Sequence, residues 1–220
     1  MTDSRVPAGH SKWLVFSIVA VLSLVADQAT KIWARDLPVV RSDGKHAACV
    51  VPDDWLPSRV EGQPGERPPV CRGVAQPVVD GFWDWRLSMN SGSAFGLFSG
   101  QKSSRIFLSL VGIVAVFGML WMLRKARPDQ RILHWALALV AGGAIGNLVD
   151  RIYYGVVTDF VLWHYHTHEW PVFNVADIVL VVGVGLMFID IQKEGRKDKA
   201  AKKARGDKAR AAGLVKNLRE

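Results

Sequence analysis

This 220-residue chain contains few cysteines, and one long segment of it contains no charged residue. Only two cysteines are present, Cys49 and Cys71. Two thiols cannot complete a four-ligand zinc site by themselves. We therefore expect either a disulfide, which an oxidising compartment would permit, or two unpaired thiols. Residues 106–123 contain no charged residue at all, whereas a surface helix of a soluble protein normally has a polar face.

Long apolar runs dominate the rest of the sequence. Four of them cover about 13–33, 106–123, 132–149 and 172–191. Each approaches the ~20 residues that a helix needs to cross a hydrocarbon core of ~30 Å. Because the runs are apolar on all sides, they favour four transmembrane helices over buried helices of a soluble domain. The first run also resembles a secretory signal peptide, but Leu24 stands where cleavage needs a small residue, so we interpret it as an uncleaved span.

The positive charge of the chain is concentrated near its end. Residues 193–220 contain eleven Lys or Arg against four acids, which accounts for most of the net charge of +8. A basic segment directly after a span is typical of a cytoplasmic topology signal or an anionic-lipid contact. No aromatic residues alternate with its basic ones, so a base-stacking RNA site is not favoured.

The loops between the runs predict the orientation. Residues 124–131 contain four basic residues and one acid, whereas the connecting loop 150–171 contains one Arg and three acids. Since positive residues mark the cytoplasmic side, both termini and the 124–131 loop are predicted to be cytoplasmic. The long connection after the first span and the 150–171 loop are predicted to face outward.

On this topology, polar residues that are unfavourable inside a membrane gather at the outer ends of three spans. They are Asp27 and Lys31 of the first span, Asn147, Asp150 and Arg151 of the third, and Asn174 and Asp177 of the fourth. Spacings of three or four residues place several of them on a shared helix face. One site near the outer interface explains this gathering. The pairs Asp27–Lys31 and Asp150–Arg151 have an alternative interpretation as purely structural ion pairs.

Asp159 and Asp177 differ from the other acids because each lies among apolar residues without an adjacent base. Two carboxylates brought together in such surroundings cannot both ionise easily, so one pKa rises. A pair of this kind can activate water and protonate a leaving amine. The alternative is that each Asp caps a turn or a helix, which the position of Asp177 near a helix start would favour.

Four sequence motifs, and the order in which they occur, resemble those of the lipoprotein signal peptidase family, also called signal peptidase II. They are DQATK (27–31), NSGSAFGLF (90–98), GGAIGNLVDRIYYGVVTDF (142–160) and FNVADIVLVVG (173–183). The resemblance covers nearly all of residues 13–192. It implies an intramembrane aspartic endopeptidase of the bacterial cytoplasmic (inner) membrane that needs no metal or cofactor and is inhibited by globomycin. Such an enzyme removes the signal peptide of a diacylglyceryl-modified prolipoprotein by cutting before the lipidated cysteine.

The resemblance also assigns roles to particular residues. It implies that Asp159 and Asp177 form the catalytic pair. It gives site-shaping or substrate-contacting roles to a set of motif residues, namely Asp27, Lys31, Asn90, Gly92, Asn147, Asp150, Arg151 and Asn174. The implied partners are prolipoproteins and membrane lipids, without nucleic acid.

The resemblance divides the chain into a four-span peptidase domain, 1–192, and a basic cytoplasmic tail, 193–220. It also implies a small periplasmic β-rich element within about 40–100. The outer insert 36–84 is longer than the family usually has, and its cysteines are not part of the family pattern. Ser93 replaces a common Ala.

Three other functions remain open. His164, His166 and His168 alternate in the sequence and would share one face of a strand, where they could bind zinc, although an HExxH motif is absent. A carrier or proton relay would need a polar path across the membrane. A scaffold that only binds lipoproteins would tolerate loss of the aspartates.

Overall fold

Four long helices and a four-stranded sheet make up the computed structural model, which describes residues 8–38, 73–90 and 101–217. In chain order the elements are α1 (Ala8–Ala34), β1 (Gln76–Val79), β2 (Trp83–Asn90), α2 (Gln101–Lys125), α3 (Arg131–Tyr153), β3 (Val157–Tyr165), β4 (His168–Glu169) and α4 (Val175–Asn217). The segments long and apolar enough to cross a membrane are Ser11–Ala34, Arg105–Lys125, Arg131–Tyr153 and Val175–Lys208. The predicted integral membrane fold, mainly α with a small sheet, is confirmed.

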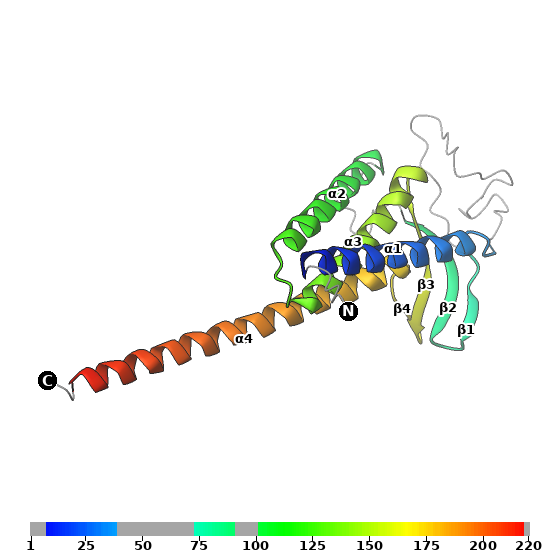
Figure 1. The fold of residues 1–220 in the computed structure, drawn as a ribbon. Helices are drawn as coiled ribbons and strands as arrows, with labels where there is room; N and C mark the ends of the chain where they lie inside the picture. Colours follow the sequence, from blue (N-terminus) through cyan, green and yellow to red (C-terminus); the bar gives the residue numbers. More distant parts are fainter. Residues whose placement is uncertain (1–7, 39–72, 91–100, 218–220) are drawn as a thin grey trace, which may run out of the picture.

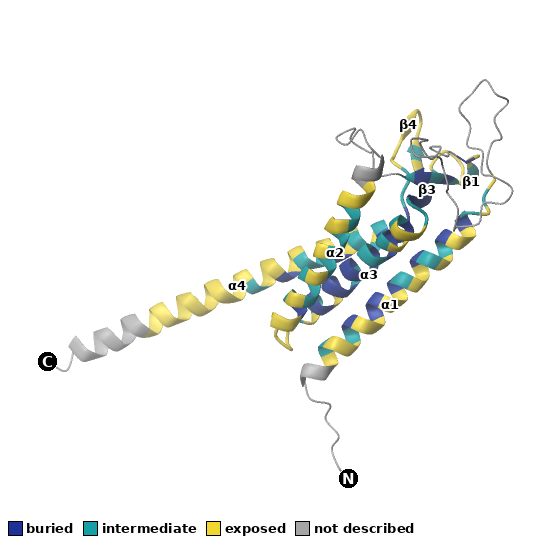
Figure 2. Cartoon of the chain, turned by 90° about the horizontal axis from the view of Figure 1, so that it is seen from above, coloured by how far each residue is buried: buried dark blue, intermediate teal, exposed yellow. Residues whose placement is uncertain are grey.

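α3 forms the centre of the helix bundle and contacts α1, α2 and α4. Figure 2 shows buried positions concentrated on α3, whereas α2 and most of α4 are largely exposed. Glycines permit this central position. A Cβ on Gly142 would lie 2.8 Å from the main-chain oxygen of Ala20, and one on Gly143 would lie 2.6 Å from that of Ala176. Such close backbone approach is typical of membrane helices.

α4 begins at Val175 rather than at 172, and it continues without a break through the basic tail to Asn217. Its 43 residues correspond to a length of about 64 Å at ~1.5 Å per residue. Figure 1 shows the last part extending far beyond the other helices. Ala, Lys and Arg are strong helix formers, which explains why residues 193–217 stay helical outside the bundle.

The sheet is antiparallel throughout, with the strand order β1-β2-β3-β4. Its first two strands fall within the predicted β-rich region of about 40–100. The other two strands come from 157–169, within the predicted connecting loop 150–171. The β-branched and aromatic residues of VVTDFVLW pack well in a sheet, and they supply β3.

Two contacts bring the sheet to the ends of α1 and α4. The ring of Trp33, near the end of α1, packs edge-on against Trp85 of β2 at 5.2 Å and Phe160 of β3 at 5.8 Å between centroids. Phe173, which precedes α4, exchanges main-chain hydrogen bonds with Val161 of β3 at 2.8 and 3.1 Å. The end of α1, the middle of β3 and the start of α4 therefore meet in one place.

Candidate active site

α1 contributes a buried ion pair to this meeting point. Asp27 and Lys31 are fully buried, and Nζ of Lys31 lies 2.9 Å from Oδ2 of Asp27. The same ammonium donates to Oδ1 of Asn147 at 2.9 Å and lies 3.6 Å from Oδ2 of Asp150. A buried charge needs such partners to offset its lost hydration, and here they come from α1 and α3 together.

Arg35 is a site residue that the sequence analysis missed. Its guanidinium donates to Oδ1 of Asp150 at 3.0 Å and to Oγ1 of Thr158 at 3.2 Å. It also covers the ring of Tyr154 at 3.8 Å. Oδ2 of Asp150 in turn accepts the main-chain N–H of Thr158 at 2.8 Å. Arg35 and Asp150 therefore hold the start of β3, one residue before Asp159.

A repeated spacing could have revealed Arg35. It follows Lys31 by four residues, just as Lys31 follows Asp27, so all three lie on one side of α1 and its continuation; Arg35 is the first residue after α1, and its main-chain N–H still donates to the oxygen of Lys31 at 3.1 Å. The predicted first span ended at residue 33, which left Arg35 in the following loop.

The structure changes the pairing that was considered for Asp150 and Arg151. Asp150 pairs with Lys31 and Arg35, not with its neighbour in the sequence. Arg151 instead donates to the main-chain oxygen of Asn147 at 3.2 Å. It lies close enough to interact electrostatically with the carboxylates on β3 and α4.

Asp159 and Asp177 are held by neutral groups. Oδ1 of Asp159 accepts the side-chain amide of Asn174 at 2.7 Å, and Oδ2 accepts that of Asn90 at 2.9 Å. Oδ1 of Asp177 accepts the side-chain amide of Asn147 at 2.9 Å. Within residues 8–38, 73–90 and 101–217, neither carboxylate forms a salt bridge. Their negative charge is therefore not offset by a directly bound cation, in contrast to that of Asp27 and Asp150.

Asn174 connects the two carboxylates. It precedes the first residue of α4, and its Oδ1 accepts the main-chain N–H of Asp177 at 3.0 Å. Oδ2 of Asp177 accepts the main-chain N–H of Asn174 at 3.2 Å, which completes a reciprocal cap. The Asn174 amide nitrogen remains free to donate to Asp159 and, at 3.1 Å, to Asn147. Asp177 can therefore cap α4 and also belong to the candidate site.

The electrostatics of Asp159 suit proton transfer near neutral pH. Its side chain is only 2% exposed. Burial and, next, the charge of Asp177 raise the pKa of Asp159 from 3.8 to about 7, although hydrogen bonds from Asn90 and Asn174 oppose the shift. A carboxyl group with a pKa near the working pH can both give and take a proton.

The structure places the remaining candidates as follows. Asp27, Lys31, Asn90, Asn147, Asp150, Arg151 and Asn174 all lie in the network around the two aspartates. Gly92, Ser93, Cys49 and Cys71 lie outside the described residues, as does most of the outer insert.

The hypothesis that the three histidines share one strand face and bind zinc is wrong. His164 lies on β3, where its Nε2 is 3.1 Å from Oδ2 of Asp84. His166 is in the following turn with a φ of 53°, and His168 is on β4. They therefore do not share one strand face. In the part of the chain that the structure describes, no group of three or more His, Cys, Asp or Glu is placed to hold a metal ion.

These features define a class: a membrane protein of several spans with, at one end of its bundle, a carboxylate pair that forms no salt bridge among the described residues. Residues 19–193 match the family model described as signal peptidase (SPase) II. The chain is 35% identical, over 83% of its length and 93% of the relative, to a lipoprotein signal peptidase of Geobacter metallireducens. It is 37% identical, over 66% of its length and 86% of the relative, to one of Xanthomonas campestris. The chain belongs to the signal peptidase II family, and it is therefore a membrane protease.

A solved structure supports the fold. It is described as a bacterial membrane enzyme determined by the in meso method, and it aligns with 82% of this chain and 88% of its own with a TM-score of 0.59 at 22% identity. At that identity the likeness concerns the fold alone.

Proposed function

We propose that this protein removes signal peptides from prolipoproteins as an aspartic endopeptidase, with Asp159 and Asp177 as its catalytic pair. One observation carries the proposal. Of the four acids gathered at this end of the bundle, Asp27 and Asp150 are paired with cations, whereas Asp159 and the half-buried Asp177 are joined through Asn174 and have no salt bridge in the described chain. Membership of the signal peptidase II family supports the same reaction.

In the proposed first step, Asp159 is protonated and Asp177 is ionised. The pKa of Asp159 near 7 supports this assignment. Asp177 takes a proton from a water molecule while the water oxygen attacks the scissile carbonyl carbon. Asp159 gives its proton to the carbonyl oxygen, which produces a neutral tetrahedral diol.

In the second step the diol collapses. Asp177 gives its proton to the leaving amine nitrogen as the C–N bond breaks, and a diol hydroxyl returns a proton to Asp159. The products are a carboxylic acid and an amine, and both aspartates regain their starting states. No metal or cofactor takes part in this scheme. Asn90, Asn147 and Asn174 keep the two carboxylates in position throughout.

The proposed substrate is a prolipoprotein whose cysteine carries a diacylglyceryl group, and the cleaved bond lies immediately before that cysteine. We place the protein in the bacterial cytoplasmic membrane with both termini cytoplasmic and the active site toward the outer leaflet. The basic loop 124–131 and the basic residues of 193–220 support this orientation. In this scheme residues 1–192 are the peptidase and residues 193–220 are a cytoplasmic tail. Lipid-anchored substrate then reaches the carboxylates from within the bilayer.

The packing of the bundle argues against a carrier. Toward the other end of the helices, apolar side chains of α1, α2 and α3 form a buried cluster that includes Phe16, Val19, Leu123 and Leu137. On α3, the buried residues between His134 and Asn147 are all Ala, Leu, Val or Gly, so a proton or ion path along this helix would lack polar side chains there.

The decisive experiment measures cleavage of a diacylglyceryl-modified prolipoprotein by the purified full chain in detergent. Asp159→Asn and Asp177→Asn are compared with Asp36→Asn, a matched change at an exposed residue just after α1. We expect both site variants to lose at least about a thousandfold in rate while they remain folded, with Asp36→Asn unaffected. Globomycin should inhibit the wild type, and a metal chelator should not.

Cleavage that persists in both site variants would place catalysis elsewhere. Loss of activity on addition of the chelator would require a metal. A folded wild-type protein that binds but never cleaves the modified substrate would indicate a lipoprotein-binding scaffold.

A further inference from the structure

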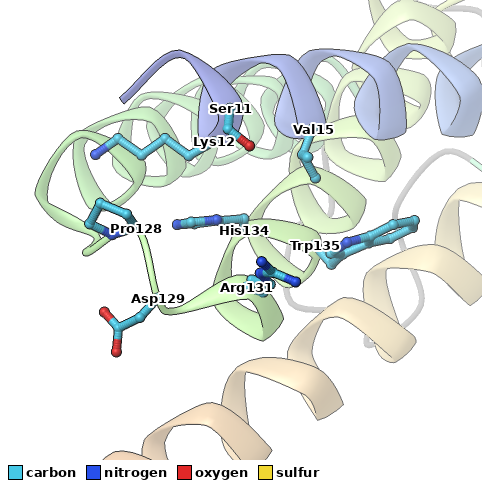
Figure 3. Close-up of a pocket in the computed structure, with 8 residues that line it drawn as sticks. All are labelled: Ser11, Lys12, Val15, Pro128, Asp129, Arg131, His134 and Trp135. Atoms are coloured by element: carbon cyan, nitrogen blue, oxygen red, sulfur yellow. The ribbon is translucent and has the colours of Figure 1, made fainter. Parts of the chain in front are cut away.

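A cavity of about 710 Å³ lies at the other end of the bundle from the candidate active site. It is formed by the start of α1, the loop 126–130 and the first turns of α3, as Figure 3 shows. His134 in its wall and Asn147 in the active site are thirteen residues apart on α3. This corresponds to about 20 Å along the helix, so the cavity is separate from the catalytic machinery.

Two cations in the cavity wall have no carboxylate partner among the described residues. Nζ of Lys12 donates to the main-chain oxygens of Arg124 and Ala126, at 3.1 and 2.9 Å. These carbonyls belong to the last turn of α2 and to the residue that follows it, and they fix the ammonium in place without neutralising its charge. Arg131, the first residue of α3, forms no ion pair with any residue that the structure describes. Figure 3 shows the ring of His134 between these two side chains.

The single acid of the cavity wall is already neutralised. Oδ1 of Asp129 accepts a hydrogen bond from Nε of Arg127 at 3.1 Å, and Nζ of Lys197 on α4 lies 3.9 Å from its Oδ2. These bonds with Arg127 lower the pKa of Asp129, so it stays ionised and paired. The net unpaired charge that faces the cavity is therefore positive.

The cavity wall is also amphiphilic. Trp135 lines it with half of its surface exposed, and Val15 lines it from α1. A ligand here would meet cations on one side and an exposed indole on the other. Indole rings are common at membrane–water interfaces, and basic pockets between spans on the cytoplasmic side accept anionic headgroups.

We propose that this cavity binds the phosphodiester headgroup of an anionic phospholipid, with Arg131 and Lys12 on the phosphate and Trp135 against the glycerol and upper acyl region. The site is independent of peptide cleavage, so it does not rest on the catalytic proposal. A free phosphate ion would satisfy the cations but not the apolar wall. The lipid is therefore the favoured occupant.

The test uses native mass spectrometry of the full chain in detergent doped with phosphatidylglycerol or with phosphatidylcholine. A third arm adds inorganic phosphate to the phosphatidylglycerol sample. The variant is Arg131→Gln, and the matched control is Arg124→Gln, an exposed arginine near the same loop that does not line the cavity. Prolipoprotein cleavage is measured for each variant to show that it is folded.

We expect the wild type to retain one phosphatidylglycerol in preference to phosphatidylcholine. Arg131→Gln should weaken this binding at least about tenfold, which is the effect of losing one charge-assisted hydrogen bond. Arg124→Gln should bind as the wild type does, and both variants should cleave substrate normally. Equal weakening in the two variants would show general surface attraction and overturn the site. Equal retention of the two lipids, or full displacement by millimolar phosphate, would overturn the lipid as its ligand.

Discussion

Asn174 and Asp177 hydrogen-bond to each other in both directions across the first turn of α4, at 3.0 and 3.2 Å. A reciprocal cap of this kind ordinarily serves only to start a helix. Here it also fixes the direction of the Asp177 carboxylate and turns the Asn174 amide toward Asp159. Helix capping and alignment of the proposed catalytic pair therefore depend on the same two side chains.

Asn174→Ser separates these two roles. The serine hydroxyl can still cap α4, because Ser is about as good an N-cap as Asn, but it is too short to donate to Asp159. We expect a stability close to that of the wild type and a loss of about a hundredfold or more in kcat. Thermal unfolding and prolipoprotein cleavage measure the two effects.

Asn174→Ala is the matched comparison, since it removes both the cap and the bridge. It should lose about 1 kcal/mol of stability in addition to the activity. If Asn174→Ser cleaved substrate at the wild-type rate, the bridge to Asp159 would have no catalytic importance.

The pKa of Asp159 predicts a specific dependence of stability on pH. The pKa is raised from 3.8 to about 7, so between these values the folded protein keeps a proton that the unfolded chain has released. The free energy of unfolding therefore falls as the pH rises from about 4 to 7. Asp159→Asn has no such titration, and its stability relative to the wild type should increase over this interval by up to about 4 kcal/mol.

The measurement is the melting temperature of both proteins in detergent between pH 4 and pH 8. The difference between the two curves is the readout, because groups that do not interact with Asp159 titrate equally in both and a constant offset reflects altered hydrogen bonds. Asp177 interacts with Asp159, so the difference reports the titration of the coupled pair. Asp36→Asn serves as the control and should follow the wild type. Parallel curves for Asp159→Asn and the wild type would show that the pKa of Asp159 is not raised.

The sequence was sufficient to predict the four spans, since uninterrupted apolar runs have few other solutions in a chain of this size. It also indicated which polar residues gather at one end, because the alternating direction of successive spans and helix spacing bring them to the same end of the bundle. It indicated the Asp27–Lys31 pair, which the structure contains, but it did not reveal the partners of Asp150. Asp150 has Arg151 beside it, yet it pairs with Lys31 and Arg35 from another helix. Only packing decides such pairings.

The sheet was harder to predict for a related reason. β3 has a β-branched, apolar sequence that is typical of a strand, but its partner β2 lies about 70 residues earlier in the chain. Pairing over that distance leaves no local signal. The aromatic contacts of Trp33 with β2 and β3 likewise appear only when the chain is folded.

Gly146 should be intolerant of a side chain. A Cβ at this position would collide with the carboxylate of Asp27, which accepts the main-chain N–H of Ala176 at 2.9 Å and pairs with Lys31. Gly146→Ala should therefore lose about 1–3 kcal/mol of stability by overpacking and at least about tenfold in cleavage rate. Thermal unfolding and cleavage assays check both.

Gly185→Ala is the matched control on α4, where a Cβ meets nothing within 4 Å. It should leave activity unchanged and be neutral or up to about 1 kcal/mol more stable, because Ala favours helix over Gly. A Gly146→Ala protein with normal stability and activity would mean that α1 and α3 can separate at the site without consequence.

Arg35 is a positioning residue, since it reaches Asp159 only through Asp150 and Thr158. Arg35→Lys keeps the charge but cannot reproduce the planar fork that binds both partners and stacks on Tyr154. We expect kcat to fall about tenfold with little change in KM, because β3 shifts while substrate contacts remain. Arg35→Gln should also lose about 1.5–3 kcal/mol of stability, the usual effect of losing a hydrogen bond to a charged group, because Lys31 still lies 3.6 Å from Asp150.

Arg86→Lys provides the comparison, because Arg86 of β2 makes a similar two-pronged contact with a more exposed acid, Glu169. Exposed pairs contribute at most about 1 kcal/mol, so this variant should keep its stability and its kcat. A change in KM alone in Arg35→Lys would instead place Arg35 against the substrate. Equal losses of kcat in the two lysine variants would mean that the whole sheet, rather than the Arg35–Asp150–Thr158 connection, sets the position of Asp159.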